Sequence, residues 1–517
     1  MSRLENSIKN LFLSLGNNLF SSLLGLVSRT VFIYILGTEY LGLAGLLGNV
    51  LGFLTISELG IATAIGFSLY KPLAEKDYKS ISALMSVYRR AYAVIGCIVL
   101  ISGIALFFSL DFFISPDQQP TGTEVAYFAF LLNTVVGYFL SYKTTLISSD
   151  NQAFRLVPIN MGMNIIQTIA QIAVLLLFRN YTVYLAIQMV GSIIIMFLQN
   201  RYITKKYEKV DFYSKEQLRP EVKIQLKRNI GGLVIAKMGD YLVNSTDNLI
   251  ITKLVSLSAT GIYSNYLLIR NLVNGYIATI FSSLTASLGN IVAVESNERK
   301  KEVFDIMMFC AYFIYSFEAV CFLCLFNPFI GDIWLGKEYI FDTSTVLIIV
   351  INNYLTGLRI PLITMKGAAG TYMEDAWIPF AFAGVNLVAS VIFVKWMGVA
   401  GVFLGTIVGS MLTADWYRPV IIYRKVFHAS VVSYYKRYIL YVILGFLNMI
   451  VAYWLCSLMN TSLVFLDFIL KVLISALTPL IINSVLFYRT EEFKTVKRMG
   501  NRIMKKIVCK FTNKNLI

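Results

Sequence analysis

Long apolar segments follow one another along almost the whole chain, with short polar connections between them. The hydrocarbon core of a bilayer is about 30 Å thick, and a helix needs about 20 apolar residues to cross it. Lipid cannot hydrogen-bond the peptide backbone, so segments of this kind span a membrane as helices. Of the 517 residues 57% are apolar and 14% are charged, whereas a soluble domain carries about 25% charged residues. The sequence therefore predicts an all-α polytopic membrane protein.

We expect about 14 transmembrane helices, arranged as two six-helix lobes around a central cavity and followed by two C-terminal helices. Because this number is even, both termini should face the same side of the membrane. The expected spans are residues 11–36, 43–69, 88–110, 124–147, 156–178, 182–203, 230–254, 261–292, 303–330, 341–366, 376–396, 398–422, 436–457 and 463–488.

Lysine and arginine are concentrated in every second connection. Nine lie in the stretch Arg201–Arg228 and nine in Arg489–Lys514, whereas the predicted loop Asp111–Glu124 is acidic and has no basic residue. Cytoplasmic connections carry the excess of basic residues in membrane proteins, so we predict that both termini are cytoplasmic. The net charge of +16 follows from this bias and favours contact with anionic lipid headgroups, and we expect no nucleic-acid partner.

The longest polar stretch, residues 200–229, separates two groups of spans. Apolar residues in its second half recur every four positions among basic ones, which is typical of a helix lying on the membrane surface. The expected divisions are a first lobe at residues 1–204, a cytoplasmic connector with an interfacial helix at 205–229, a second lobe at 230–425, two further spans at 426–488 and a basic cytoplasmic tail at 489–517.

A weak internal repeat supports the two lobes. The connection Leu36–Leu47 is similar to Val255–Tyr266, and the alignment places Gly42 opposite Gly261, 219 residues further along. Both copies start in the same predicted orientation, which indicates a parallel repeat about an axis normal to the membrane. We therefore expect a cavity between the two repeats.

Several motifs are similar to those of a known family. Arg29 is followed by LGTEYLGL at 36–43, SELGIATAI at 57–65 and LYKPL at 69–73, and TGIYSNY stands at 260–266. With the number of spans, these residues resemble the bacterial polysaccharide repeat-unit flippases (O-antigen, capsule and exopolysaccharide), in the multidrug/oligosaccharidyl-lipid/polysaccharide exporter superfamily.

The resemblance implies ion-coupled, alternating-access translocation of an undecaprenyl-diphosphate-linked oligosaccharide. The cargo would move from the inner to the outer leaflet of the cytoplasmic membrane of a bacterium, for surface polysaccharide synthesis. The expected partners are this lipid-linked glycan, protons or sodium, membrane lipids, and the polymerase and chain-length proteins of the same pathway. No cofactor is expected.

Four basic residues inside the predicted spans are candidates for binding the diphosphate. A charge at the centre of a membrane helix costs about 2.5–3.5 kcal/mol on insertion scales, so such a residue faces water, a partner or a substrate. Arginine stays charged there, and its forked guanidinium matches a phosphate. We expect Arg29 and Arg270 to hold the diphosphate from opposite lobes, and Lys237 and Arg359 to receive it on the cytoplasmic side. Alternatively, these residues pair with carboxylates and fix helix packing.

Four carboxylates in the spans, Asp247, Asp240, Glu58 and Glu318, are candidates for ion coupling. A desolvated carboxyl group can load and release a proton as its access alternates. For Asp240 a static salt bridge with Lys237, three residues earlier, is the alternative.

Uncharged polar residues of the first lobe are further candidates. They would hydrogen-bond a glycan or, equally, one another, and they are Asn133, Tyr138, Asn164, Gln167 and Gln171. In the twelfth span, Gly401, Gly405 and Gly409 recur every four residues, which predicts a close helix contact.

Two other transport functions stay open. A multidrug or organic-cation antiporter of the same superfamily would need carboxylates in its cavity, whereas here the basic residues balance the acidic ones. A peptidoglycan lipid-precursor flippase shares the diphosphate headgroup, so charge does not exclude it. An enzyme is not expected, because the longest outer loop, Asp111–Glu124, is short and lacks basic residues. The six cysteines and one histidine form no spacing typical of a metal site.

Overall fold

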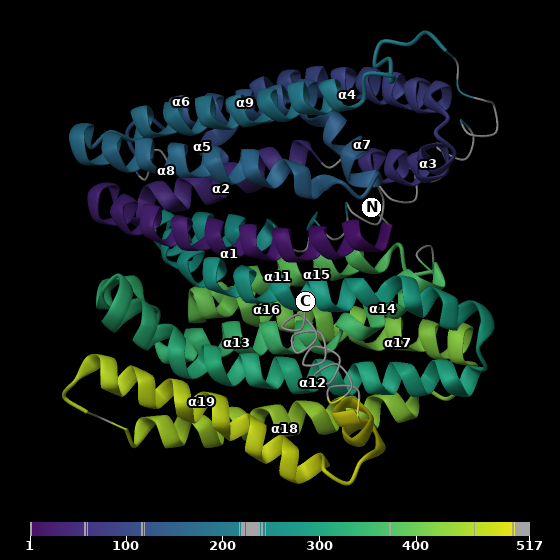
Figure 1. Ribbon diagram of the computed structural model, residues 1–517. Coiled ribbons are helices and arrows are strands. Elements are labelled where there is room, and N and C mark those ends of the chain that lie inside the picture. The colour runs from purple at the N-terminus through teal and green to yellow at the C-terminus, as the bar shows by residue number, and fades with distance from the viewer. Residues whose placement is uncertain are drawn as a thin grey trace, which may run out of the picture. The chain divides into compact units, whose positions relative to one another are not determined.

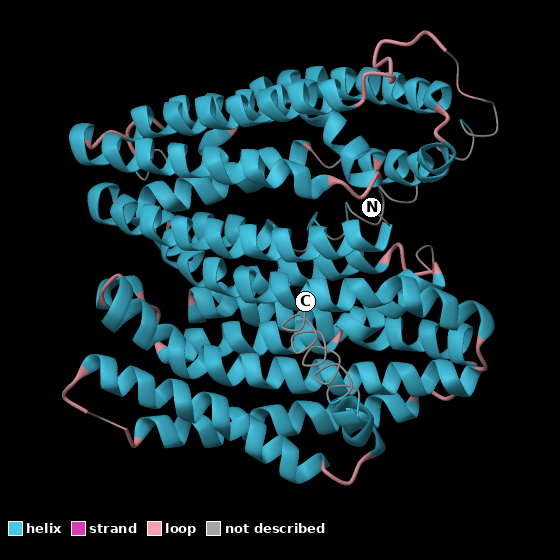
Figure 2. Ribbon diagram, viewed as in Figure 1, coloured by secondary structure: helices cyan, strands magenta, loops and turns pink. Residues whose placement is uncertain are grey.

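The structure is a computed structural model of the 517-residue chain. It describes residues 3–55, 58, 60–114, 117, 119–216, 218, 223, 238, 241–242, 245–371, 374–459, 461–498 and 501. In this part of the chain every regular element is a helix and no strand occurs (Figure 2). The predicted all-α fold is therefore confirmed.

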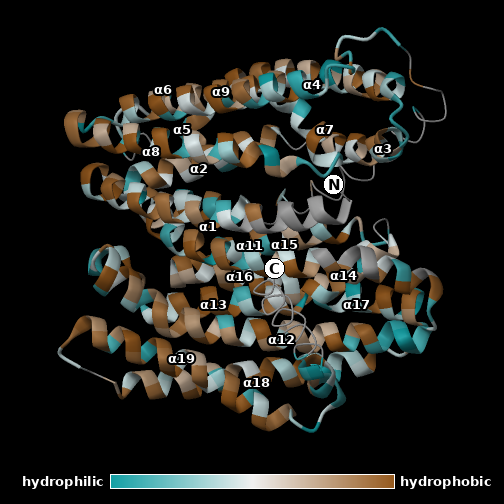
Figure 3. Cartoon of the chain, viewed as in Figure 1, coloured by the Kyte–Doolittle hydropathy of each residue, from teal (hydrophilic) through white to brown (hydrophobic). Residues whose placement is uncertain are grey.

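The helices follow the apolar segments of the sequence (Figures 1 and 3). Up to residue 206 they are α1 (Arg3–Leu36), α2 (Thr38–Leu54), α3 (Ile61–Glu75), α4 (Tyr78–Phe107), α5 (Leu110–Phe113), α6 (Thr123–Leu140), α7 (Thr144–Ser149), α8 (Val157–Phe178) and α9 (Tyr181–Lys206). From residue 257 they are α11 (Leu257–Val294), α12 (Asn297–Asn327), α13 (Thr343–Leu358), α14 (Ile360–Ala369), α15 (Ile378–Met397), α16 (Val399–Leu412), α17 (Ala414–Ile422), α18 (Val432–Ser457) and α19 (Val464–Phe487). Residues 245–254 are also helical.

Polar residues begin four of the long helices, as expected of N-caps. The side chains of Asp77, Asn180, Ser296 and Asp342 accept hydrogen bonds from backbone N–H groups at the starts of α4, α9, α12 and α13. These caps help to fix where the four helices begin, since each satisfies donors that have no partner within the helix.

Within the described residues, 11 helical segments are long and apolar enough to cross a membrane, judged by length and composition. They match the first, third to sixth and ninth to fourteenth expected spans. The eighth expected span falls within α11, and about half of the seventh, residues 230–254, lies outside the described residues. The chain is thus a multi-pass helical membrane protein.

One expected span is not a single helix. Residues 43–69 fall on α2 and α3, which are separated by a break at residues 55–60. Leu54 ends α2, Gly60 stands before α3, and the Glu58 backbone N–H donates to the Thr55 carbonyl oxygen at 3.0 Å in a short turn. Hydropathy averages over such a turn, so the sequence did not predict it.

The chain forms two compact units. The first contains Met1–Tyr276, Ala376–Leu387 and Val394–Val402, and the second contains Ile277–Asp375, Val388–Phe393 and Phe403–Ile517. In the first unit α1 packs on α8, α8 on α9, α9 on α6 and α6 on α4. Its core is aliphatic and aromatic, with the fully buried side chains of Leu43, Leu46 and Tyr127 among its members.

In the second unit α12 is the central helix, with α13, α18 and α19 packed around it. Three of these helices meet at a fully buried polar network. Tyr312 of α12 donates to the Asn483 side-chain oxygen of α19 at 2.5 Å, and Asn448 of α18 donates to the same oxygen at 2.9 Å. The Asn483 amide donates in turn to the Ser316 hydroxyl at 3.0 Å. Polar groups in lipid need internal partners, so this network fixes α18 and α19 to α12.

Candidate functional site

Arg29 lies on α1 and its guanidinium reaches α11. One terminal nitrogen donates to the Ser264 carbonyl oxygen at 3.1 Å and the other to the Ser264 hydroxyl at 2.5 Å. The Ser264 hydroxyl itself donates to the Gly261 carbonyl oxygen at 2.6 Å. Among the described residues Arg29 forms these hydrogen bonds and no ion pair, and its buried Nε atom has no hydrogen-bond partner. Within the described residues the cation is therefore held by neutral groups.

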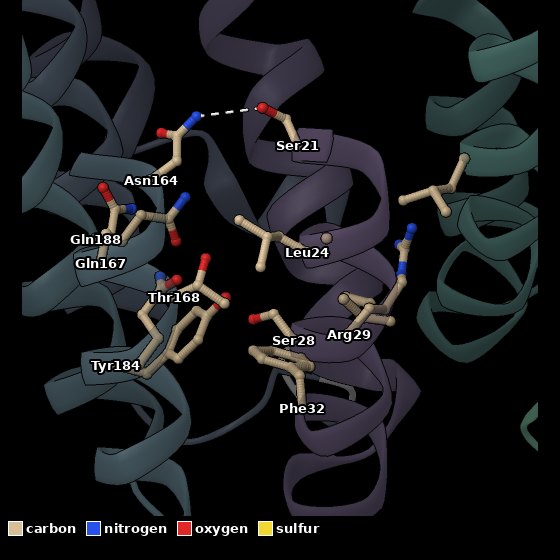
Figure 4. A pocket seen from close by; sticks show the side chains of 14 residues that line it. Ser21, Leu24, Ser28, Arg29, Phe32, Asn164, Gln167, Thr168, Tyr184 and Gln188 are labelled. Atoms are coloured by element: carbon tan, nitrogen blue, oxygen red, sulfur yellow. Dashed lines mark hydrogen bonds between the residues drawn. The ribbon is translucent and has the colours of Figure 1, made fainter. Parts of the chain in front are cut away.

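A cavity of about 300 Å³ adjoins Arg29 within the first unit. Figure 4 shows α1, α8 and α9 presenting side chains to it, with the Arg29 guanidinium pointing away from the amides of α8 and α9. The polar side chains that line it are Ser21, Ser28, Arg29, Asn164, Gln167, Thr168, Gln171, Tyr184 and Gln188. The only hydrogen bond drawn between them runs from the Asn164 amide to the Ser21 hydroxyl at 3.4 Å.

The chemistry of this lining is neutral apart from one positive charge at its edge. None of the described residues that line the cavity is Asp or Glu. Amides and hydroxyls both donate and accept, so they suit a hydroxyl-rich ligand, whereas a cationic ligand would need a negative partner. The cavity is therefore suited to a polar, neutral or anionic group.

Three of the five predicted glycan-contacting residues meet here. Asn164, Gln167 and Gln171 line the cavity, whereas Asn133 lines a smaller one of about 30 Å³ that shares Gln188. Tyr138 packs instead against Tyr92, with ring centroids 5.4 Å apart.

The sequence reasoning missed Tyr184, Gln188, Ser28 and Thr168. For two of them the sequence contained a usable pattern. Tyr184 and Gln188 stand four residues apart in an apolar span and so share a helix face. The same spacing relates Gln167 and Gln171 on α8.

Arg270 and Asp247 lie in the first unit, as Arg29 does. The Tyr263 phenol interacts with the Arg270 guanidinium and with the Asp247 carboxylate. The Asn386 amide of α15 donates to the Asp247 carboxylate at 3.5 Å. Arg270 does not line the cavity beside Arg29, so the structure does not bring the two arginines together around it.

Glu58 stands at the break between α2 and α3. Its carboxylate accepts a hydrogen bond of 2.5 Å from the Tyr92 hydroxyl of α4, and Tyr138 of α6 lies against the same carboxylate. Tyr88 packs on Tyr92 with ring centroids 4.3 Å apart. An aromatic enclosure of this kind shields a carboxyl group from water.

The remaining candidates do not join this cavity. Arg359 forms a buried ion pair in the second unit, donating to the Asp415 carboxylate at 3.1 Å and to the Thr356 hydroxyl at 2.7 Å. Glu318 is buried in α12 of the same unit. Lys237 and Asp240 lie outside the described residues.

Another ion-pair cluster lies close to Arg359 in the sequence. The Asp375 carboxylate is 1% exposed and pairs with Lys366 of α14 and with Arg418 of α17, the latter at 3.1 Å. The adjacent Glu374 pairs with the exposed Lys425 at 3.0 Å. These contacts connect α14, α17 and the turn before α15.

Comparison with protein-family models found no match, and neither did comparison with curated proteins. Solved structures do resemble the chain. A structure described as the lipid II flippase MurJ, in an inward closed conformation, aligns with a TM-score of 0.63 and 14% identity, over 92% of this chain and 99% of that one. An inward-facing multidrug resistance MATE transporter of the MOP superfamily aligns with a TM-score of 0.61 and 13% identity, over 86% and 98%.

A third similar structure is a MOP superfamily transporter from Pyrococcus furiosus, with a TM-score of 0.54 and 13% identity, over 87% of this chain and 96% of that one. At these identities the likeness is one of fold. The chain therefore has the fold of MOP superfamily transporters, and its helices cover nearly the full length of each. A lipid flippase and multidrug transporters share this fold, so the fold does not distinguish between these functions.

Proposed function

We propose that this protein is a flippase for undecaprenyl-diphosphate-linked oligosaccharide repeat units. It would move them from the inner to the outer leaflet of the cytoplasmic membrane of a bacterium, by ion-coupled alternating access, for surface polysaccharide synthesis. The motifs around Arg29 and Glu58 that resemble the polysaccharide repeat-unit flippases, and the MOP superfamily fold, support this proposal.

The observation that carries the proposal is the cavity beside Arg29. It combines one arginine that has no carboxylate partner among the described residues with a lining of amides and hydroxyls. A lipid-linked repeat unit has the matching parts, a diphosphate with about two negative charges and a neutral, hydroxyl-rich glycan. In a low-dielectric site the guanidinium stays charged and donates to phosphate oxygens.

Within this proposal, four basic residues bind the diphosphate at successive stages. They are Arg29, Arg270, Lys237 and Arg359. Arg29 is the best supported, since its Nε is free of a protein partner in the described part of the chain. Arg359 is the least supported, because Asp415 already neutralises it.

Ion coupling is assigned to carboxylates. Glu58 and Asp247 have surroundings that suit this role, because each is held by neutral hydrogen-bond donors of another helix. Asp240 and Glu318 are the further candidates. Protons and sodium ions are both compatible with such groups.

A peptidoglycan lipid-precursor flippase is the second candidate. One observation favours it, the TM-score of 0.63 to a structure described as the lipid II flippase MurJ. An organic-cation antiporter is less well supported, because the described lining of the cavity has no carboxylate.

Depletion of the protein separates these functions. Our proposal predicts that lipid-linked repeat units accumulate while the amount of lipid II is unchanged, as measured by mass spectrometry of extracted lipids. Accumulation of lipid II alone would instead establish the second candidate. A rise in sensitivity to cationic dyes, with both lipid pools unchanged, would establish the antiporter.

Substitution of Arg29 tests the binding residue directly. Arg29→Ala should lower transport at equal membrane abundance by at least about tenfold, and Arg29→Lys should retain part of it, because lysine keeps the charge but loses the forked donor geometry. Arg299→Ala is the matched control, since Arg299 forms only an exposed ion pair with Glu302 on α12. Full transport by Arg29→Ala would contradict the assigned role.

A further inference from the structure

Two cysteines of the second unit contact the backbone of α19. The Cys321 thiol of α12 donates to the Ser475 carbonyl oxygen at 3.9 Å, and the Cys456 thiol of α18 donates to the Lys471 carbonyl oxygen at 4.0 Å. Both α12 and α18 also bind Asn483, which is further along α19, through residues that precede these cysteines. The two helices therefore run antiparallel to α19 and parallel to each other.

Cys324 of α12 lies opposite Cys456 of α18. Cys324 is almost one turn beyond Cys321, so the antiparallel packing brings it one turn down α19, to the level at which Cys456 meets that helix. The thiols of Cys324 and Cys456 are within hydrogen-bonding reach of each other. Both side chains are buried, and both thiols are free. Two helices thus hold a pair of reduced thiols face to face.

This thiol pair lies near the ends of its helices and beside a cation. Cys324 is three residues from the end of α12, and Cys456 is one residue from the end of α18. Both helices begin at basic connections, so these far ends are predicted to face the outer side. The Lys471 ammonium, which pairs with Asp467 at 2.5 Å, is close to both thiols. A neighbouring cation favours the thiolate, which is the form that attacks a disulfide.

We infer that Cys324 and Cys456 form a site of reversible oxidation, at which a disulfide joins α12 to α18. The oxidant is a disulfide compound on the predicted outer side. The Cys456 thiolate attacks one sulfur of the oxidant, so that the S–S bond of the oxidant breaks, a mixed disulfide forms and one thiol leaves. The Cys324 thiolate then attacks the Cys456 sulfur, which forms the protein disulfide and releases the second thiol. The protein thiols give up two electrons and two protons, and the oxidant is reduced to two thiols.

The disulfide would close a long loop of the chain. Cys456 follows Cys324 by 132 residues, and a bond across so long a loop strongly limits the unfolded chain. It would reinforce two of the three helices that the buried network of Asn448 and Asn483 joins about 12 Å deeper in the unit. The inference concerns the stability of the second unit and does not rest on the proposed transport function.

Oxidation of the purified full-length protein tests the site. We expect oxidised glutathione to link the peptide that contains Cys324 to the peptide that contains Cys456, as identified by mass spectrometry after the remaining thiols have been alkylated. A link between Cys321 and Cys324 instead would overturn the inference. So would the absence of any link at the highest ratio of oxidised to reduced glutathione.

Thermal unfolding in detergent measures the consequence of the bond. The midpoint should rise by about 5 °C on oxidation and return after reduction with dithiothreitol. Cys456→Ser should abolish this shift, whereas the matched control Cys310→Ser should keep it, because Cys310 is 14 residues before Cys324 on the same helix. Each variant is compared with itself in two redox states, so a loss of packing does not affect the comparison. A shift that persists in Cys456→Ser, or linked protein that unfolds at the midpoint of reduced protein, would overturn the inference.

The side from which the oxidant acts is a separate readout. Oxidised glutathione does not cross membranes, so it should link Cys324 to Cys456 in cells whose outer barriers have been removed and leave both thiols free in inverted vesicles. The reverse pattern would overturn the outer location of the site. None of these measurements requires the cargo.

Discussion

Arg29 and Arg359 carry the same charged group but are held by different partners. Arg359 is paired with Asp415 and is 8% exposed, so its charge is neutralised within the protein. Arg29 is hydrogen-bonded to a serine hydroxyl and a carbonyl oxygen. A buried pair mainly fixes structure, whereas a cation on neutral groups stays available to an anion.

The sequence predicted which residues carry charge into the membrane but not what those charges meet. Ser264 is 235 residues from Arg29 and Asp415 is 56 residues from Arg359. Periodicity along one helix has no information about such partners. It does predict shared faces, so the four-residue spacing of Tyr184 and Gln188 could have added them to the candidates.

Asp375 provides a prediction at this scale. Asp375→Asn should lower the free energy of unfolding by about 3–5 kcal/mol, because it removes the buried carboxylate that pairs with both Lys366 and Arg418. Thermal unfolding of the protein in detergent would measure the effect. The neighbouring Glu374→Gln is the control, expected to cost about 1 kcal/mol or less, since its partner Lys425 is 55% exposed. Equal costs for the two changes would contradict the buried role of Asp375.

At the scale of elements, length and hydropathy were enough to place most helices. The break at Glu58 was not predicted, because Ser57–Gly60 is too short to lower the hydropathy of a 20-residue window. It is stabilised by tertiary contact, the hydrogen bond from Tyr92 of α4, which no local signal records.

Close helix contact was predicted from the glycines of the twelfth span and is confirmed at Gly405. A Cβ atom there would lie 2.4 Å from the Ser390 backbone nitrogen, between α16 and α15. Gly405→Ala should therefore destabilise the protein by about 1–3 kcal/mol, because backbone atoms cannot turn aside as a side chain can.

The control for this prediction is Gly384→Ala on α15. Gly384 is exposed, with no atom within 4 Å of an added Cβ, so alanine should be neutral or stabilise by about 0.5–1 kcal/mol. The thermal unfolding midpoints of the two variants and of the parent protein, measured in the same detergent, would test this difference in stability. Equal stability of Gly405→Ala and the parent would contradict the close contact.

At the scale of the whole molecule, the basic connections predict which ends of the helices are cytoplasmic. A cysteine introduced at Asp117 should react with an impermeant maleimide in intact cells, after removal of any outer barrier. A cysteine at Lys209 should react only in inverted vesicles. Both side chains are exposed, so access depends on the side of the membrane and not on burial. The reverse pattern would invert the predicted topology.

The buried network of Tyr312, Ser316, Asn448 and Asn483 has a consequence for biosynthesis. The chain leaves the ribosome from its N-terminus, so α12 and α18 enter the membrane before Asn483 of α19 has been made. Until then the Asn448 amide and the Tyr312 hydroxyl lack the oxygen that both of them bind in the finished protein. The second unit thus completes this network only after α19 has been inserted. A chain truncated before residue 483 would leave the Tyr312 hydroxyl and the Asn448 amide without this acceptor inside the membrane, and we expect membrane proteases to degrade it.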